Sequence, residues 1–412
     1  MRGRIGRWKW IFGLIAAAIL GLGFWIGGRT SAPTLKPQVA AILPPTAKWP
    51  ANIATLKVEA PKKTDHSGEI EVCGVGKVTI DRDDWMATSK LFDTLTRKSR
   101  VRWLSALRNS DDYRTRATGL YLEGILDRDA PQKDPETARD ELVQLAVETK
   151  DPAVFALAFT KCGKGLDDSA SPGACPQLSL DQWTRTDPDN AVPWLQLAAL
   201  AHRQHDGATE AAAMGRAAQA HQYETYNGSL FVFAEPAMPN DVTPADRWYL
   251  ATEIIGVEAA MPMPYQPLSQ YCSQDAMNDA GVRGQCNALG ELLVAKATTL
   301  LDLSAGKSLG KRAGWPAERV DKLTQQLNAS MQVLNQAVPS DEDQQWSCDG
   351  VARGNAFMSE RVRLGEMGFA REAIERSGET VAELSRKHLD FIEKLTQDAQ
   401  QRMQDENAAR LP

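Results

Sequence analysis

The chain has 412 residues, of which 43% are hydrophobic and 24% are charged, a composition typical of folded, core-forming proteins and not of disordered ones. Lys and Arg number 47 against 53 Asp and Glu, which gives a net charge of -6 at pH 7. This acidic balance argues against a nucleic-acid-binding protein, because such a protein needs a basic surface facing the phosphates. We therefore expect no nucleic-acid partner.

Residues 10–28 form a run of 19 uncharged, mostly apolar residues. As a helix this run would span about 28 Å, close to the roughly 30 Å hydrocarbon core of a bilayer. The basic residues directly before it are Arg2, Arg4, Arg7 and Lys9. By the positive-inside rule we predict a basic cytoplasmic tail over residues 1–9, a transmembrane signal anchor over residues 10–28, and export of the rest of the chain.

A cleaved signal peptide is the alternative interpretation of this segment. Thr30, Ser31 and Ala32 are small enough for a cleavage site, but Pro33 comes directly after them. The apolar run is also longer than the usual apolar region of a signal peptide, about 7 to 15 residues. Both interpretations export the remainder of the chain. In a Gram-negative-type envelope they predict a protein whose bulk lies in the periplasm, and the retained anchor makes it a single-pass inner-membrane protein.

All six cysteines come after the anchor in the chain, and an even number of cysteines in an exported chain is typical of disulfides. Two pairs, Cys162–Cys175 and Cys272–Cys286, are close in sequence, and the first encloses a loop with Gly and Pro. We predict these two local bridges, which leaves Cys73–Cys348 as a long-range bridge. Metal thiolates are the weaker alternative, because no CxxC pair is present.

The segment after the anchor changes from an extended chain to a small β structure. Residues 30–66 carry six prolines, a density that blocks both helix and sheet, so we expect an extended tether. Residues 69–81 alternate apolar and polar positions around Gly74 and Gly76, which predicts a β-hairpin. A GxG also occurs in nucleotide sites, but the third glycine and the subsequent helix are missing, so we expect no cofactor.

From residue 85 onward the apolar spacing is mostly helical. The segments predicted to be helical are 86–109, 112–127, 135–149, 151–162, 243–260, 268–309, 316–337, 346–376 and 380–407. Residues 225–241 interrupt the helical pattern. We divide this part into an N-terminal helical region with the small hairpin, residues 67–240, and a C-terminal helical region, residues 241–412.

The stretch over residues 183–221 carries the most specific pattern. Its first part has a large residue followed by small ones at helical spacing, and its second part has small residues with a one-residue slip; the matching positions are Trp194, Leu197, Ala198, Ala201, Ala211, Met214, Ala217 and Ala218. This pattern resembles a tetratricopeptide repeat over about 34 residues, with Asp187 and Pro188 at the expected boundary. The resemblance implies paired helices that stack into an α-solenoid and bind partners on a concave face. An ordinary Ala-rich helical hairpin is the alternative.

One short stretch matches parts of several catalytic patterns. Ser304 with Lys307, and Ser308 with Lys311, have the SxxK spacing of serine acylases, and the middle of the stretch reads GxSxG. The SDN and KTG elements of the acylase class are missing, and no strand is expected before Ser308. The first glycine of a phosphate-binding loop is replaced by Leu301. We therefore expect a helix end followed by a turn, with no catalytic residue.

Two histidines near the predicted helical hairpin are the best metal candidates in the chain. His202 and His205 share a helix face, with Asp206 adjacent and Glu210 on the next helix. A structural zinc site needs four ligands, and His221 is distant in sequence. We expect polar residues at a turn, and no metal site.

The sequence as a whole predicts a mainly α protein: one transmembrane helix, a small β-hairpin near residues 69–81, and a repeat-like α-helical ectodomain. The function expected is protein–protein interaction, as a scaffold, adaptor or chaperone-like module. Its partners would be unidentified envelope proteins, with the inner membrane contacted through residues 10–28. An envelope or cell-wall hydrolase with an unrecognised site, and a structural subunit of an envelope complex, are the alternatives.

Overall fold

The computed structural model describes residues 68–79, 85–126, 135–163, 173–337 and 342–408. The predicted cytoplasmic tail, transmembrane anchor and tether, residues 1–9, 10–28 and 30–66, lie outside the described residues. Within the described ranges, no helix is both long enough and apolar enough to cross a membrane.

The predicted β-hairpin is confirmed. Its strands are β1 (Glu69–Val72) and β2 (Gly76–Thr79), which pair antiparallel with Ile70 opposite Val78. Gly74 lies in the turn with φ of +78°, a conformation that costs glycine little because it has no Cβ. Ile70 and Val72 point into the protein and are 3% and 2% exposed. The hairpin therefore has one buried face and one solvent face.

The helices of the N-terminal region match the predicted segments closely. They are α2 (Trp85–Arg108), α3 (Tyr113–Leu122), α4 (Pro135–Thr149), α5 (Pro152–Lys161), α6 (Leu180–Thr186), α7 (Ala191–Arg203) and α8 (Gly207–Gln219). Four of these helices are capped by a side chain that accepts a hydrogen bond from a backbone N–H of the first turn. The capping residues are Asp112, Asp151, Asn190 and Asp206. Such caps satisfy donors that have no partner inside the helix.

Most of the remaining helices also match the predicted segments closely, and the exception is the stretch 268–309. They are α9 (Leu230–Ala234), α10 (Pro244–Ala260), α11 (Tyr265–Tyr271), α12 (Ala280–Lys296), α13 (Leu300–Ala313), α14 (Ala317–Ala337), α15 (Glu342–Gln345), α16 (Cys348–Ser377) and α17 (Val381–Ala408). The predicted stretch 268–309 contains α11, α12 and α13, because Asp279 caps the start of α12 and Thr299 caps the start of α13. Residues 225–241 hold only the short α9 and 3-10 turns.

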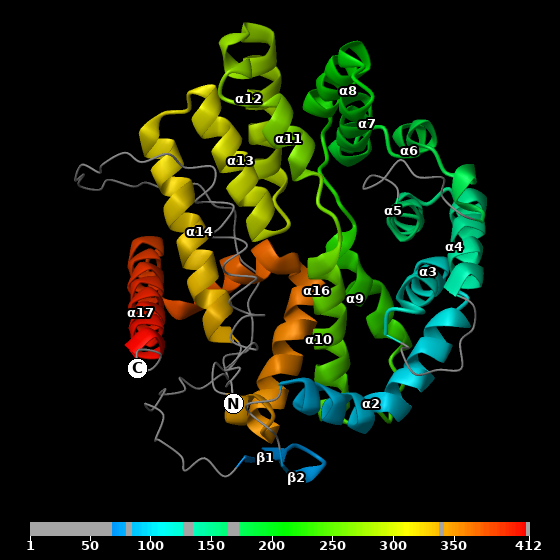
Figure 1. Cartoon of the computed structure of the whole chain (residues 1–412), viewed down its shortest axis with the longest axis vertical. Helices are drawn as coiled ribbons and strands as arrows, with labels where there is room; N and C mark the ends of the chain where they lie inside the picture. The colour runs from blue at the N-terminus through cyan, green and yellow to red at the C-terminus, as the bar shows by residue number, and fades with distance from the viewer. Residues whose placement is uncertain (1–67, 80–84, 127–134, 164–172, 338–341, 409–412) are drawn as a thin grey trace.

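The helices are arranged in an arc around two central helices. Figure 1 shows α2 to α8 succeeding one another along one side, α11 to α14 continuing around the other, and α10 and α16 between them. One large hydrophobic core extends from Ile70 to Met358. Trp103 and Trp248 lie in it at 0% and 2% exposure. Helices from both expected regions, 67–240 and 241–412, therefore contribute to one core.

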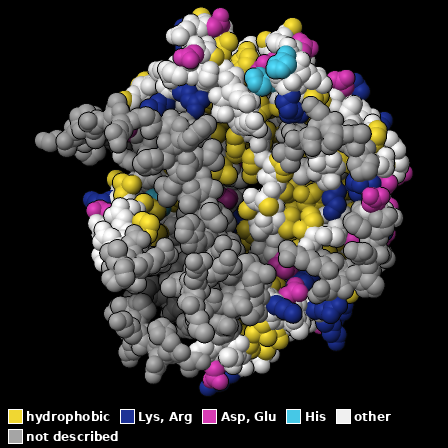
Figure 2. Space-filling view, viewed as in Figure 1, with side chains coloured by type: hydrophobic (Ala, Val, Ile, Leu, Met, Phe, Trp, Pro, Cys, Tyr) yellow, Lys and Arg dark blue, Asp and Glu magenta, His cyan; other side chains and the backbone are white. Residues whose placement is uncertain are grey.

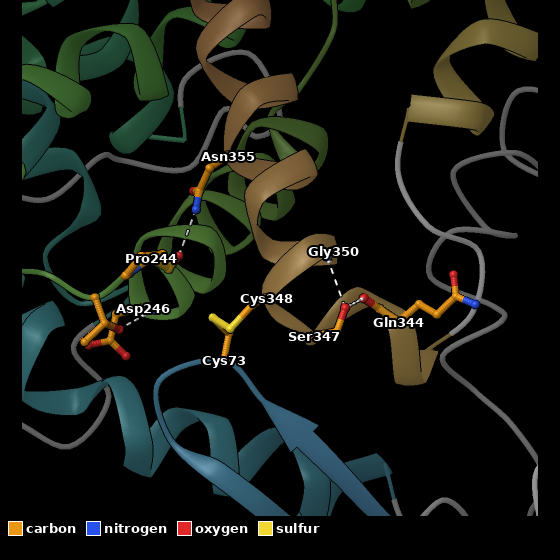
Figure 3. The surroundings of a disulfide bond; sticks show 9 residues. Cys73, Pro244, Asp246, Gln344, Ser347, Cys348, Gly350 and Asn355 are labelled. Atoms are coloured by element: carbon orange, nitrogen blue, oxygen red, sulfur yellow. Dashed lines mark hydrogen bonds between the residues drawn. A yellow bond between two sulfur atoms is a disulfide. The ribbon is translucent and has the colours of Figure 1, made fainter. Parts of the chain in front are cut away.

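All six cysteines are in disulfides: Cys73–Cys348, Cys162–Cys175 and Cys272–Cys286. These are the three pairs that the spacing predicts. Cys73 also donates its backbone N–H to the carbonyl of Trp346 at 2.9 Å. Figure 3 shows the long-range disulfide joining the hairpin to the start of α16. There the Ser347 hydroxyl accepts from the Gly350 N–H at 3.1 Å and caps the helix.

The stretch that resembles a tetratricopeptide repeat forms a helical hairpin. In Figure 1, α7 and α8 lie side by side, joined by a short turn. Ala198, Ala201, Met214 and Ala217 are all buried, so the small residues permit close packing. The helical architecture in Figure 1 is compatible with repeat-like stacking.

Candidate interaction surface

The last helix, α17, is attached to the rest of the protein by its first half. Leu384 is 0% exposed and packs with Val333 of α14 and Ala370 of α16 in a small separate core. The hydroxyl of Ser385 accepts from the Asn328 side-chain amide at 3.2 Å. These contacts hold the start of α17 against α14.

The apolar stripe of α17 continues past this contact into solvent. Leu384, His388, Phe391 and Leu395 are three or four residues apart in turn, so they lie on one face of the helix. Phe391 and Leu395 are nevertheless 43% and 44% exposed, and Met403 further on is 58% exposed. Within the described residues, five of the nine exposed large hydrophobic side chains lie on α17. Figure 2 shows hydrophobic side chains at the surface over this helix. Such clustering distinguishes a candidate contact surface from scattered surface apolar residues.

Polar contacts within α17 and next to it support its helical conformation independently of a partner. Thr380 and Glu383 bond reciprocally, with Thr380 N–H donating to the Glu383 carboxylate at 2.8 Å and Glu383 N–H donating to the Thr380 hydroxyl at 3.2 Å. The Thr380 N–H and hydroxyl both donate to this carboxylate and hold the pKa of Glu383 below its ordinary value. Lys387 pairs with Glu379, and Gln397 donates to Glu393 at 3.1 Å. The exposed stripe is therefore presented on a helix that is already formed, which reduces the ordering cost of binding.

A second feature lies on the opposite side of the molecule, around the segment after α8. Tyr226 donates its hydroxyl to Asp187 at 3.0 Å, and Asn190 donates to the same carboxylate oxygen at 2.7 Å. The Asn190 side chain also accepts from the Glu224 N–H at 3.0 Å. Tyr226 has φ of +59°, a conformation that is uncommon and costly outside glycine. These bonds fix residues 221–229 onto the start of α7.

A related cluster fixes the start of α13. Asp302, at 1% exposure, accepts from the hydroxyl of Tyr265 at 2.6 Å. Its second carboxylate oxygen accepts from the backbone N–H groups and hydroxyls of Thr298 and Thr299, at 2.9 to 3.1 Å. The carboxylate therefore has five donors around it, all of them in the protein. It anchors α11 to α13.

The first cluster contains two carboxylates, Asp187 and Glu224, whose pKa is raised above the ordinary value. Burial raises the pKa of Asp187, against hydrogen bonds from Asn190 and Tyr226 that lower it. Burial also raises the pKa of Glu224, with Asp302 and Asp187 adding to the rise. Perturbed carboxylates are a feature of acid–base sites. Here the donors around Asp187 and Asp302 belong to helix ends and to the loop that they fix, so the arrangement is a structural network.

The stretch with catalytic spacing lies inside a helix. Ser304, Lys307, Ser308 and Lys311 are all on α13, which continues to Ala313, so the expectation of a helix end at this point is wrong. The Ser308 hydroxyl donates to the Ser304 carbonyl at 2.8 Å. Burial, and secondarily Lys311, lowers the pKa of the half-buried Lys307. A nucleophile elbow requires a strand before the serine and a sharp turn at it, and this geometry has neither.

The glycines of that stretch have a packing role. A Cβ on Gly306 would lie 2.9 Å from the Leu293 side chain and from the Val294 backbone nitrogen, both on α12. A Cβ on Gly290 of α12 would in turn lie 3.2 Å from the Gly306 carbonyl. The absence of side chains therefore allows α12 and α13 to approach closely. This requirement explains the GxSxG spacing without catalysis.

The candidate metal residues lie at the turn between α7 and α8. His202 Nδ1 lies 3.1 Å from the Glu210 carboxylate, and the His202 side chain is 47% exposed. Asp206 caps α8 through the Thr209 N–H at 3.0 Å, and His205 has φ of +57° in the turn. Across the described part of the chain, no group of three or more His, Cys, Asp or Glu residues could hold a metal ion.

The chain matches no protein-family model, and neither a curated protein nor a solved structure matches it significantly. The roles of the candidate surface and of the two carboxylate clusters are therefore inferred only from the residues and contacts of this chain. Sequence reasoning predicted a helix over residues 380–407 but not the exposure of its apolar side chains. It missed the Asp187 and Asp302 clusters, for which the only signals were the break in helical pattern at residues 225–241 and the Thr299-to-Asp302 spacing of a capping box.

Proposed function

We propose that this protein is a protein–protein interaction module, acting as a scaffold, adaptor or chaperone-like component. The observation that carries the proposal is the exposed apolar stripe of α17, with Phe391 and Leu395 at its centre. An apolar helix face of this kind is the recognition element of helix-in-groove and helix–helix complexes. The partner would present a complementary apolar groove or helix.

The proposed setting is the periplasmic side of a bacterial inner membrane. Residues 10–28 supply the signal anchor in this proposal, with residues 1–9 in the cytoplasm and residues 30–66 as the tether. Three disulfides support it, because structural disulfides persist in oxidising compartments. The α7–α8 hairpin supports a repeat-like ectodomain, and we propose it as a single tetratricopeptide-like unit.

Co-purification of the full-length protein after crosslinking in its native envelope tests the function. The test variant is Phe391→Ser with Leu395→Ser. Both side chains are more than 40% exposed, so we expect the fold to be retained. The wild type should recover one or more envelope proteins reproducibly, and the variant should lose them. The matched control is Glu393→Ser with Gln400→Ser, two exposed positions on the other side of the helix, which should recover the same proteins as the wild type.

A structural subunit of a larger envelope complex is the second candidate, favoured by the same apolar stripe. The two proposals differ in the lifetime and stoichiometry of the complex. A subunit should co-purify at a fixed ratio without crosslinking, whereas an adaptor should require the crosslinker. Recovery of the wild type alone, as a monomer, would contradict both.

A further inference from the structure

Helix α16 consists of two helical segments that meet at Gly365. Gly365 has φ of +69° and ψ of 172°, a region of backbone conformation that is accessible essentially only to glycine. The segments are residues 348–364 and residues 366–377. The direction of the second segment therefore depends on the backbone angles at one residue.

The kink coincides with a change of hydrophobic core. Val351 and Met358, before the kink, belong to the main core. Met367, after it, packs with residues of α13 and α14 in a second cluster, and Ala370 packs with α14 and α17 in a third. Gly365 therefore lies between the part of α16 in the main core and the part that packs with α13, α14 and α17.

Three charged side chains lie together beside this kink. Glu258 of α10 is 5% exposed and accepts from the Phe231 N–H of α9 at 3.1 Å. Its other carboxylate oxygen lies 3.6 Å from the Arg361 guanidinium, which lies 3.8 Å from the Glu366 carboxylate. Glu366 accepts from the Leu300 N–H of α13 at 2.9 Å. Arg361 and Glu366 lie on opposite sides of Gly365, so a guanidinium shared between two carboxylates bridges the kink.

The protonation of Glu258 is balanced near neutrality. Burial raises its pKa to about 7, opposed by the attraction of Arg361 and by backbone N–H groups of α9, and assisted by the repulsion of Glu366. Arg361 and Glu366, both from α16, are the charged groups that act on it, whereas α9 contributes only backbone donors. When Glu258 gains a proton, Arg361 keeps one carboxylate partner, Glu366.

We propose that Glu258, Arg361 and Glu366 form a proton-sensitive latch that sets the angle between the two segments of α16. With Glu258 ionised, Arg361 is held between α10 and the second segment. With Glu258 protonated, Arg361 pairs with Glu366 alone, and the second segment moves relative to α10 together with α14 and α17. The latch acts on the position of the exposed stripe and does not depend on which partner binds there.

Distance measurement between spin labels tests the latch in the full-length protein. The labels are attached to keto amino acids incorporated at the exposed positions Thr94 of α2 and Gln397 of α17, which leaves the disulfides intact. The wild type should show two distance populations whose ratio changes with a midpoint near pH 7. Because one proton controls the ratio, it should change by up to about tenfold per pH unit. A single unchanged distance between about pH 5 and about pH 9 would overturn the proposal.

Two variants separate the latch from a general effect of pH. Glu258→Gln should hold the low-pH distance at every pH, because its side chain carries no charge. Glu366→Gln removes the repulsion that raises the pKa of Glu258, so its midpoint should move to lower pH. The control Glu291→Gln, which breaks a pair with Arg319 on the surface, should titrate like the wild type. If the midpoint is unchanged in both Glu258→Gln and Glu366→Gln, another group controls the motion and the proposal is wrong.

Discussion

Cys73 and Cys348 are separated by 275 positions in sequence, yet their Cα atoms lie 4.6 Å apart in a disulfide. The bond joins the turn of the β-hairpin to the first turn of α16 (Figure 3). Beneath the hairpin, the rings of Phe92 and Trp346 stack with centroids 4.1 Å apart. The hairpin itself has only two short strands, and an isolated hairpin is marginal in water. The disulfide, the bond from the Cys73 N–H to the Trp346 carbonyl and the burial of Ile70 and Val72 therefore hold it in place.

Removal of this disulfide by Cys73→Ser with Cys348→Ser should release the hairpin before the rest of the protein unfolds. We expect a stability loss of about 5–6 kcal/mol in the chain-entropy model, measured by urea unfolding. Amide exchange in residues 69–79 should rise strongly. The control Cys162→Ser with Cys175→Ser opens a much shorter loop and should leave the hairpin amides protected. Unchanged exchange in residues 69–79 of the first variant would show that packing alone holds the hairpin.

The start of α13 should depend on Asp302. Asp302→Ala removes the acceptor for five donors and leaves the half-buried hydroxyl of Tyr265 without its partner. We expect a loss of about 2–4 kcal/mol in the free energy of unfolding, from lost capping and an unsatisfied donor. Asp302→Asn keeps the shape and one acceptor oxygen and should lose less. Equal losses in the two variants, measured by urea unfolding, would contradict this assignment.

Glu258 should make stability depend on pH in a defined direction. Its pKa in the folded protein is raised to about 7 from 4.5, so the folded state binds the proton more tightly than the unfolded state does. The wild type should therefore lose stability relative to Glu258→Gln as the pH rises from about 4.5 to about 7, with a constant difference above that. At about 1.4 kcal/mol per pKa unit, the total should be about 3–4 kcal/mol. Parallel stability curves for the two proteins would contradict the raised pKa.

The sequence predicts local structure well where a start or stop signal is explicit. Asp151 before Pro152 marks the start of α5, and the alternation around Gly74 marks the hairpin. The sequence does not predict the division of the stretch 268–309 into three helices, because the helical apolar spacing continues through the caps at Asp279 and Thr299. Likewise the Gly and Lys residues before Gly314 suggest a helix end several residues early, although Gly314 itself, with φ of +94°, ends α13.

The candidate surface and the latch depend on tertiary contacts, which cannot be predicted from the spacing of residues in the sequence. Periodicity identifies Phe391 and Leu395 as one face of a helix, but their exposure depends on how far α14 covers α17. Glu258 is one of three acidic residues on α10, and its burial results from the packing of α9 and α16 around it. The ion pair between Arg361 and Glu366 also cannot be predicted from the sequence. It depends on the kink at Gly365, and the helical spacing of residues 346–376 gives no sign of that kink.

Site-specific photo-crosslinking along α17 tests the proposed interaction most directly. A photoreactive amino acid is placed in the full-length protein, in its native envelope, at Phe391 or Leu395 and at the control positions Glu393 or Gln400. We predict adducts with the same partner protein from positions 391 and 395, identified by mass spectrometry, and none from positions 393 and 400. Absence of adducts from positions 391 and 395, or equal yields from all four positions, would contradict the proposal that this face binds a partner.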